Sequence, residues 1–315
     1  MERTHGGGGR SHSPWGIPHQ ERKVCTMRTT ILKKRRCICL VLTLCALFSV
    51  FGAVSAAAAS GPQFPNGSQE TPVLLDGVEV LEGECVRIGG VTYVPLRKFA
   101  NLFGECTVTW DSKTNTATVK TDALTLIAHT GNYYIYANGH YFYTVGEVLN
   151  LGGYLYVPIR PMALAFDADL EWNASKNQVE LRSGGKNAVA WANYDADDLY
   201  WLSRIISAES AGEPFKGQIA VGNVVLNRVE HPSYPNTVYG VIFDRKHGTQ
   251  FSPVSLGTIY RTPSESSVIA AKICLEGYTL SDEVLFFFNP RIATTNWISK
   301  NRPYAFTIGQ HEFYK

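Results

Sequence analysis

An excess of charge of either sign is missing from this 315-residue sequence, which contains 29 lysines and arginines and 27 aspartates and glutamates. The net charge of +2 gives no indication of a nucleic-acid-binding protein, because such proteins carry a clear positive excess. Cysteine pairs with the CxxC spacing of metal sites are also missing. The 45% of hydrophobic residues is enough for two globular units, each with a core of its own.

The N-terminal segment, residues 1–59, is predicted to be a leader with an export signal rather than part of a fold. From Met27 onward, a basic run is followed by the apolar stretch 37–54 and then by small residues. This order is typical of a signal peptide with cleavage after Ala57 or Ala59, and it makes Met27 the natural start. The alternative is an uncleaved membrane anchor, because the apolar stretch nearly spans a bilayer.

Three of the seven cysteines, Cys85, Cys106 and Cys274, lie beyond the predicted signal. Cys85 and Cys106 have two open interpretations: a disulfide within one domain, which an exported protein allows, or two half-buried thiols. Cys274 stands between aliphatic residues on a predicted helix, so we expect it in a core.

After a linker predicted at residues 60–71, one pattern occurs twice. The segment 89–97, GGVTYVPLR, returns at residues 152–160 as GGYLYVPIR. Each copy is followed by a helical stripe and then by an alternating strand that ends in tryptophan, Trp110 in the first and Trp172 in the second. The pattern predicts two β-α-β-β units, whose aromatic residues we expect mainly in the core.

This repeat resembles the copper amine oxidase N-terminal domain, which occurs as a stalk on exported bacterial proteins. The resemblance covers residues 72–183 and implies an α+β stalk domain of two tandem β-α-β-β units. It does not imply copper, because His129 and His140 are the only histidines in this range and make no ligand set. The stalk is expected to hold or position the rest of the chain, and wall binding by the stalk is left open.

Longer helices are predicted over residues 188–315, and the first of them contains an unusual carboxylate. Apolar residues recur at Leu202, Ile205 and Ile206, which is the spacing of a stripe that faces a core. Glu209 occupies the next position on this stripe. A carboxylate on a buried face destabilises the fold unless it is paired, protonated or used in chemistry.

Cap residues and helix breakers predict the other elements of this second domain. They are a first helix capped by Asp195, a second helix over residues 215–229, a short helix from Asn236 to Ile242, a loop over 244–262, a helix capped by Thr262 and ending at Glu276, a strand over 284–288 and a terminal hairpin over 304–313. The domain is therefore expected to be mainly helical with a small β-sheet.

Four segments of the second domain form a further pattern: residues 202–218 (LSRIISAESAGEPFKGQ), 224–229 (VVLNRV), 250–253 (QFSP) and 287–290 (FFNP). They are similar to the SleB/CwlJ-type cell wall hydrolase family, which includes the spore cortex-lytic enzymes. The resemblance implies a compact helical fold like that of lytic transglycosylases and goose-type lysozyme, acting on peptidoglycan. It also implies that Glu209 is the catalytic glutamate.

The mechanism that the resemblance implies needs one carboxylate, whereas most glycosidases need two. Glu209 gives its proton to the glycosidic oxygen and then, as an anion, removes the proton of the muramic acid C6 hydroxyl. Burial on an apolar stripe favours this role, because burial raises the pKa of a carboxyl group. A structural glutamate paired to Arg204 or Arg228 is the alternative. Glu213 is the candidate second carboxylate, or else it caps the following helix.

Further residues near these motifs are candidates for substrate binding. Amide side chains bind sugar hydroxyls or acetamido groups, and aromatic rings offer stacking faces. The candidates are Glu213, Gln218, Asn227, Gln250 and Asn289 among the polar residues, and Phe251, Phe288, Trp297 and Tyr304 among the aromatic ones. For each of them, a role in the fold is the alternative.

The sequence therefore predicts an exported peptidoglycan-cleaving enzyme that needs no cofactor or metal. His231, His247 and His311 raise the question of a zinc amidase, but their spacing places no pair on one helix face. An N-acetylmuramoyl-L-alanine amidase and an inactive wall-binding protein are the alternative functions. The expected partner is peptidoglycan of the cell wall or the spore cortex, and a membrane is involved only if the signal segment stays uncleaved.

Overall fold

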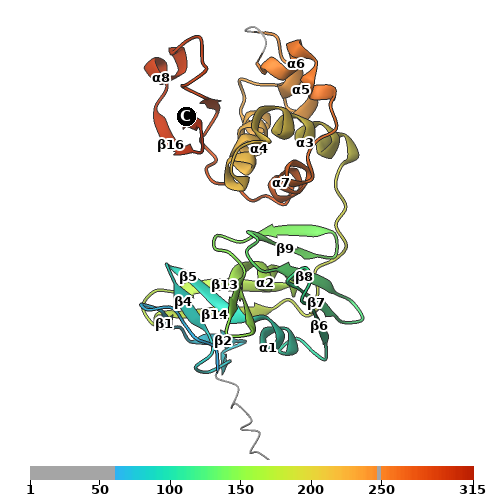
Figure 1. Cartoon of the computed structure of the whole chain (residues 1–315), viewed down its shortest axis with the longest axis vertical. Coiled ribbons are helices and arrows are strands. Elements are labelled where there is room, and N and C mark those ends of the chain that lie inside the picture. The colour runs from blue at the N-terminus through green and yellow to red at the C-terminus, as the bar shows by residue number, and fades with distance from the viewer. Residues whose placement is uncertain (1–60, 247–249) are drawn as a thin grey trace, which may run out of the picture. The chain divides into compact units, whose positions relative to one another are not determined.

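The computed structural model of the chain describes residues 61–246 and 250–315, and the predicted signal segment lies outside these ranges. No helix in the two ranges is long and apolar enough to cross a bilayer. The chain forms a β-rich part followed by a mainly helical part that begins with α3 (Ala196–Ser210) (Figure 1). This succession confirms the expected two-domain architecture.

Three small sheets make up the first domain. The first sheet has the strand order β1 (Gln69–Glu70), β4 (Val86–Ile88), β5 (Val91–Pro95), β12 (Tyr154–Pro158), β11 (Leu149–Leu151). The second has the order β10 (His140–Tyr143), β9 (Tyr134–Ala137), β8 (Thr125–His129), β7 (Thr116–Lys120), β6 (Thr107–Asp111). The third has the order β13 (Ala168–Asn173), β14 (Gln178–Ser183), β2 (Val73–Leu75), β3 (Val78–Val80), and its β14–β2 pair is parallel.

The two copies of the repeated motif pair with each other in the first sheet. β5 and β12 run antiparallel, with Val94 opposite Val157 and the proline of each motif opposite the tyrosine of the other. Each strand leads directly into a short helix, α1 (Leu96–Asn101) or α2 (Ile159–Ala165), and then into the hairpin β6–β7 or β13–β14. The hairpins join different sheets, so the two repeats share one sheet and diverge in the others.

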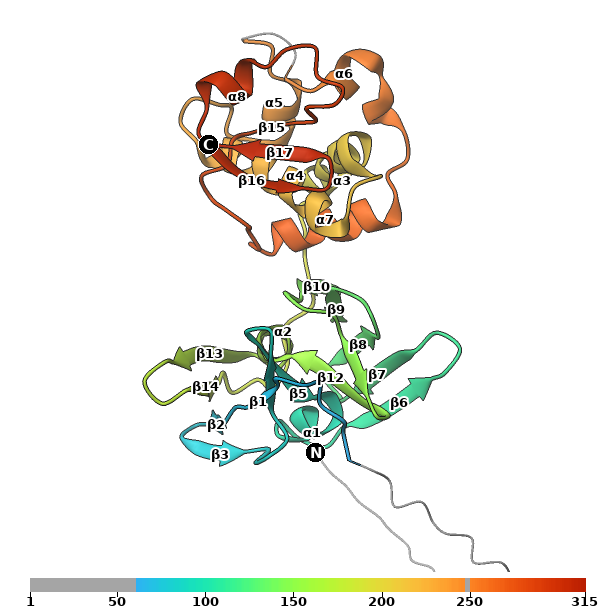
Figure 2. The same ribbon diagram turned by 60° about the vertical axis from the view of Figure 1, so that its left-hand side comes forward.

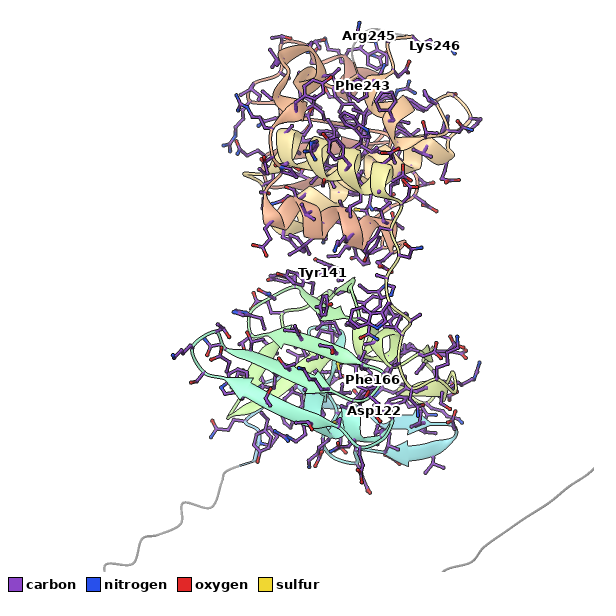
Figure 3. The ribbon with its side chains drawn as sticks, turned by 90° about the vertical axis from the view of Figure 1, so that its right-hand side faces the viewer. Asp122, Tyr141, Phe166, Phe243, Arg245 and Lys246 are labelled. Atoms are coloured by element: carbon purple, nitrogen blue, oxygen red, sulfur yellow. The ribbon has the colours of Figure 1, made fainter. Side chains whose placement is uncertain are left out.

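Phenylalanines from the helical parts of the repeat meet in the core of the first domain. Phe103 stacks on Phe166 with ring centroids 5.0 Å apart, and Phe99 meets Phe166 edge-on at 5.9 Å. Phe166 is labelled in Figure 3. In contrast, Trp110 and Trp172, which we expected in the core, are 44% and 37% exposed. They lie on β6 and β13, which are edge strands of their sheets and therefore have one uncovered side.

The three cysteines of the described chain are free thiols, so the disulfide interpretation of Cys85 and Cys106 does not hold in this structure. Cys85 is buried, and burial raises the pKa of its thiol to about 12. The Cys106 thiol instead donates a hydrogen bond to Asn101 Oδ1, with a donor–acceptor distance of 3.0 Å. Cys274 lies in the core of the second domain, as expected.

The second domain is mainly helical and has one small sheet. Its helices are α3 (Ala196–Ser210), α4 (Phe215–Glu230), α5 (Val238–Phe243), α6 (Ser252–Leu256), the 3-10 helix η1 (Thr258–Tyr260), α7 (Glu265–Leu275) and α8 (Trp297–Asn301). The antiparallel sheet has the order β15 (Phe286–Phe288), β17 (His311–Tyr314), β16 (Tyr304–Ile308) and lies beside α4 (Figure 2). The apolar faces of α3, α4 and α7 enclose one core.

Two helix starts differ from the expectation, because neighbouring residues competed for the cap position. Ser264 rather than Thr262 caps α7, and Thr237 rather than Asn236 caps α5. In both helices the hydroxyl of the capping residue accepts a hydrogen bond from a backbone N–H of the first turn. The predicted loop over 244–262 is also partly wrong, because α6 and η1 lie within it.

Gly222 lies where α4 packs closely against α3 and α7. A Cβ atom at this position would lie 2.7 Å from Cys274 Sγ and 2.8 Å from Ile206 Cδ1, and both side chains are buried. We expect Gly222→Ala to lower the free energy of unfolding by about 1–3 kcal/mol through overpacking, measured by urea denaturation of the full chain. Gly212→Ala is the control, because nothing lies within 4 Å of its added Cβ. A Gly222→Ala protein as stable as the wild type contradicts this packing.

Candidate active site

Helix α3 positions Glu209 through the apolar stripe that precedes it. Asp195 caps the helix by accepting hydrogen bonds from the amides of two first-turn residues. Leu202, Ile205 and Ile206 are fully buried, as the spacing predicted. Glu209 continues their face of the helix, and α3 ends one residue later, at Ser210. The side chain therefore extends from the buried face at a point where the helix gives way to open space.

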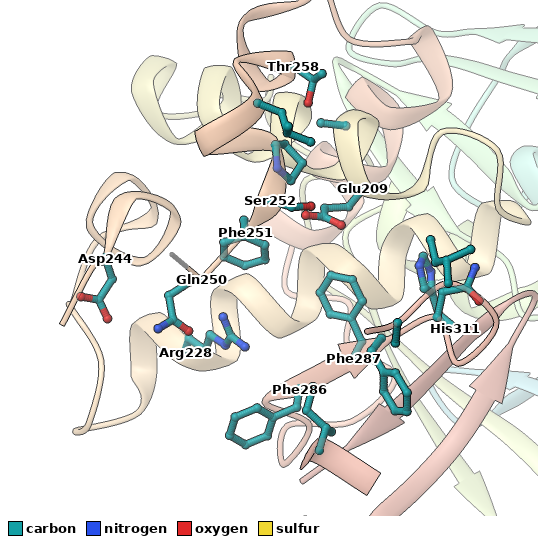
Figure 4. Close-up of a pocket in the computed structure, with 18 of the residues that line it drawn as sticks. Glu209, Arg228, Asp244, Gln250, Phe251, Ser252, Thr258, Phe286, Phe287 and His311 are labelled. Atoms are coloured by element: carbon teal, nitrogen blue, oxygen red, sulfur yellow. The ribbon is translucent and has the colours of Figure 1, made fainter. Parts of the chain in front are cut away.

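That space is a cleft of about 1620 Å³ with Glu209 in its wall. Figure 4 shows the side chain between Phe251 and Ser252 on one side and Phe287 and His311 on the other. The cleft is built from α3, α4, α6 with the segments on either side of it, strand β15, the loop after β15 together with α8, and β17. The residues of its wall include Arg204, Ala208, Glu209, Arg228, Asp244, Gln250, Phe251, Thr258, Arg261, Phe287, Phe288, Asn289, Trp297 and His311.

Glu209 is half-buried, and burial raises the pKa of its carboxyl group to about 7. The positive charge of Arg228 acts in the opposite direction, but burial is the larger effect. Within the described residues the carboxyl group makes no hydrogen bond and no salt bridge. The direct ion pair to Arg204 or Arg228 that a structural glutamate would make is therefore absent from this part of the chain. Near neutral pH, Glu209 is able both to donate and to accept a proton.

Arg228 brings a buried positive charge to the same cleft. Its side chain is 5% exposed, and its Nε donates a hydrogen bond to the carbonyl oxygen of Leu285 at 2.8 Å. The guanidinium carbon lies 5.1 Å from the ring centroid of Tyr234 and 5.2 Å from that of Phe251. Nη1 is buried and has no hydrogen-bond partner in the described structure. The cleft thus contains a buried donor without a partner among the described residues.

The sequence pattern of α4 also indicates that Arg228 is an unusual residue. On α4, Val221, Val224 and Val225 form a buried stripe, and Arg228 takes the next position on it. This is the pattern that singled out Glu209 on α3. Glu209 and Arg228 both line the cleft, because the helices that carry them, α3 and α4, pack against each other.

His311, considered in the sequence only as a zinc ligand, is a second polar group in the cleft wall. Burial lowers the pKa of its imidazole, although the charge of Glu213 acts in the opposite direction. Its Nδ1 is buried without a partner in the described structure. His231 Nδ1 accepts a hydrogen bond from the amide of Ser233, and His247 lies outside the described residues. Over residues 61–246 and 250–315, no group of three or more metal-ligating side chains is arranged around a common point.

Five of the residues predicted to bind substrate lie in the cleft wall: Gln250, Phe251, Phe288, Asn289 and Trp297. They come from the segment before α6, from β15 and the turn after it, and from α8. Their distance from Glu209 along the chain is large, so the fold and not the helix pattern brings them together. Their contact with substrate stays a prediction.

Glu213 and Gln218 face other parts of the domain. Glu213 Oε2 accepts a hydrogen bond from the amide of Gln310, at 2.8 Å, and so holds the turn between β16 and β17. Gln218 is 4% exposed, and its Oε1 accepts hydrogen bonds from the hydroxyls of Ser266 and Ser267 on α7. Neither residue belongs to the cleft wall.

Asn227 and Tyr304 also lie outside the wall of the cleft. Asn227 Nδ2 donates hydrogen bonds to the carbonyl oxygens of Ser281 and Val284, which fixes the segment before β15. Tyr304 is 57% exposed on β16, and its hydroxyl lies 2.8 Å from that of Thr307. These contacts give both residues a place in the fold.

Comparison with protein families assigns both domains. Residues 212–314 match the family model described as Cell Wall Hydrolase, and residues 74–181 match the one described as Copper amine oxidase N-terminal domain. Both resemblances that we inferred from the motifs are thereby confirmed. The chain contains a cell wall hydrolase domain that follows a copper amine oxidase N-terminal domain.

Curated proteins similar to this chain include spore cortex-lytic enzymes. That of Bacillus cereus is 41% identical over 122 residues, which are 39% of this chain and 46% of the relative. That of Bacillus subtilis is 37% identical over 142 residues, or 44% of this chain and 45% of the relative. The chain thus spans about half the length of the curated relatives it matches. A solved structure, the catalytic domain of the germination-specific lytic transglycosylase SleB from Bacillus anthracis, is 41% identical, with 39% of this chain and 98% of that chain covered and a TM-score of 0.36.

The raised pKa of Glu209 predicts that the stability of the protein depends on pH. Because the folded-state pKa lies near 7 and the ordinary value is 4.5, the protonated form stabilises the fold below pH 4.5, and this stability is lost as pH rises through 7. Glutamine stays neutral, so Glu209→Gln should be more stable than the wild type by roughly 2–3 kcal/mol at pH 8, with no difference at pH 4.

Chemical denaturation at the two pH values measures this difference. Glu230→Gln is the matched control, because Glu230 is exposed and undergoes the same chemical change. A stability difference for Glu209→Gln that is the same at pH 4 and pH 8 refutes the burial effect.

Proposed function

We propose that this chain is an exported lytic transglycosylase that cleaves peptidoglycan glycan strands, with Glu209 as general acid and then general base. The observation that carries the proposal is a single carboxyl group with a pKa of about 7 in the wall of an open cleft. A group with this pKa is present in both protonation states near neutral pH, as acid and base steps in one cycle require. The cell wall hydrolase match and the spore cortex-lytic relatives support the choice of peptidoglycan.

The arrangement of carboxylates in the described part of the cleft wall supports transglycosylation over hydrolysis. Among the described residues of the cleft wall, Asp244 is the other carboxylate. Figure 4 draws it at the opposite end of the cleft from Glu209, with Gln250 and Phe251 between them. Two-carboxylate glycosidases place both groups around one scissile bond. A mechanism in which one residue performs both proton transfers fits this geometry better.

The proposed reaction has two steps. Glu209 donates its proton to the glycosidic oxygen, and the bond between that oxygen and C1 of the muramic acid breaks. The N-acetyl group of the sugar stabilises the positive charge that develops at C1. The Glu209 carboxylate then takes the proton of the C6 hydroxyl, and the C6 oxygen bonds to C1. The product is a 1,6-anhydro sugar, no water is consumed, and Glu209 regains its proton.

We assign the remaining roles from the contacts of each residue. Gln250, Phe288 and Asn289 bind the sugars from the cleft wall, whereas Glu213 acts indirectly by holding the β16–β17 turn. The helical domain is proposed to share the general fold of lytic transglycosylases and goose-type lysozyme. The first domain holds or positions it at the wall or the spore cortex after export.

The products of digestion test the reaction. Wild-type protein incubated with purified peptidoglycan is expected to release muropeptides with 1,6-anhydro-muramic ends, identified by mass spectrometry. Glu209→Gln keeps the shape of the side chain but loses the proton, so we expect release to fall by at least about 10²-fold. Reducing ends in the wild-type digest instead indicate hydrolysis, and wild-type activity in Glu209→Gln rules out the proposed acid.

A chelator separates this proposal from the amidase alternative. Amidase activity that depends on zinc is lost with the metal, whereas a Glu209 mechanism continues at its original rate. Digestion in the presence and absence of EDTA, with release of free stem peptides as a second readout, distinguishes the two. Binding of the wild type to peptidoglycan without any cleavage supports the inactive wall-binding protein.

The pH dependence of cleavage should reflect the pKa of Glu209. The first step needs the protonated carboxyl group, and its fraction decreases about tenfold per pH unit above the pKa. We therefore expect the rate of fragment release to fall as pH rises through about 7. A rate that stays constant up to pH 9 contradicts Glu209 as the acid that limits the reaction.

A further inference from the structure

Four aromatic residues of the second domain gather around a fifth, Trp201 of α3. The ring centroid of Trp201 lies 4.9 Å from that of Tyr200, 5.4 Å from that of Tyr239 and 5.0 Å from that of Phe243. Tyr260, in η1, completes the group at 6.2 Å. Phe243, labelled in Figure 3, is the last residue of α5 and stacks on Tyr239. We call these five residues the aromatic surface.

Three of the five rings are open to solvent. Tyr200 is 44% exposed, Tyr239 53% and Tyr260 61%. In the described structure none of their hydroxyl groups has a hydrogen-bond partner, and the guanidinium of Arg204 lies over the ring of Tyr200. A cluster of exposed rings of this kind is unusual on a soluble domain and marks a binding surface. Tyrosine offers an apolar face and a polar edge together, as a sugar ring also does.

The aromatic surface is continuous with the cleft at Glu209. Tyr200, Arg204 and Ala208 are spaced four residues apart on α3 and so share one face of the helix. The Arg204 guanidinium carbon lies 3.6 Å from the ring centroid of Tyr200, and Arg204 and Ala208 belong to the cleft wall. Arg204 Nε is buried without a partner in the described residues. On the other side, Tyr260 lies between Thr258 and Arg261, which also line the cleft.

We propose that the aromatic surface binds the glycan strand beyond the sugars that flank the scissile bond. This inference rests on the proposed function and adds a second place of contact to it. Tyr200 and Glu209 are nine positions apart on α3, which corresponds to about 14 Å at 1.5 Å per residue. Sugars stacked on Tyr200, Tyr239 and Tyr260 therefore belong to a long strand and not to the pair at Glu209. The continuous wall through Arg204 gives such a strand an unbroken path.

Substrate length provides the test. We compare full-length protein on two substrates: long glycan strands freed of stem peptides, and a disaccharide that occupies only the two sugar sites at the scissile bond. Tyr239→Ala and Tyr260→Ala are each expected to raise KM for long strands by roughly fivefold with kcat unchanged. Neither should change kcat/KM for the disaccharide. The matched Tyr239→Phe and Tyr260→Phe variants keep the ring and should lose much less.

Trp191→Ala controls for the loss of an exposed aromatic elsewhere, because Trp191 is 67% exposed in the segment before α3 and is expected to have no effect. Equal kinetics of the alanine variants and the wild type on both substrates overturn the proposal. An equal loss on both substrates overturns it too, since the rings then act through the fold of the cleft. A change in oligomeric state by sedimentation, with unchanged cleavage of long strands, assigns the surface to protein contact instead. If the wild type cuts neither substrate, the proposed function itself fails.

Discussion

Burial of the Glu209 carboxyl group is the constraint on which the second domain depends. A carboxylate in place of an aliphatic residue at the end of a core stripe destabilises the fold in its ionised form, by an amount that grows with the pKa shift. The domain tolerates this because the rest of the stripe is fully buried and because α3, α4 and α7 form a single core around it. The same packing surrounds part of the Glu209 side chain with protein, and this partial burial raises the pKa of its carboxyl group to about 7.

The positive charge of Arg228 limits how far burial raises the pKa of Glu209. A carboxyl group buried without any charge nearby would have a still higher pKa and would become a poor acid, because it would give up its proton less readily. The positive charge of Arg228 favours the anion, and its own burial is offset by the Leu285 carbonyl and by aromatic faces. The pKa of about 7 is the balance of the two effects. A residue that must act first as acid and then as base needs such a balance more than it needs an extreme value.

The sequence alone predicted those features that depend on local pattern. The 3.6-residue period located α3 and Glu209, the repeated motif located β5 and β12, and the terminal hairpin was found from its alternation. Patterns could not show that Trp110 and Trp172 lie on edge strands, because strand order is a property of the whole sheet. They also could not show that Glu213, four residues from Glu209, turns toward the amide of Gln310. Closeness along the chain suggested a second catalytic carboxylate, and a tertiary hydrogen bond gave the side chain another partner.

Local sequence patterns also could not predict which distant residues join Glu209 in the cleft wall. Glu209 comes from α3, but Phe287 and His311 come from strands that follow it by many residues, and they reach it only through the sheet beside α4. The turn between β16 and β17 leaves no room for a side chain at Gly309. This glycine has a φ of +59°, and a Cβ there would lie 2.0 Å from Glu213 Oε2, so a side chain at this turn would displace the carboxylate. Glu213 thus contributes to the cleft without entering it, because the turn it holds leads directly into β17, the strand that places His311 in the wall.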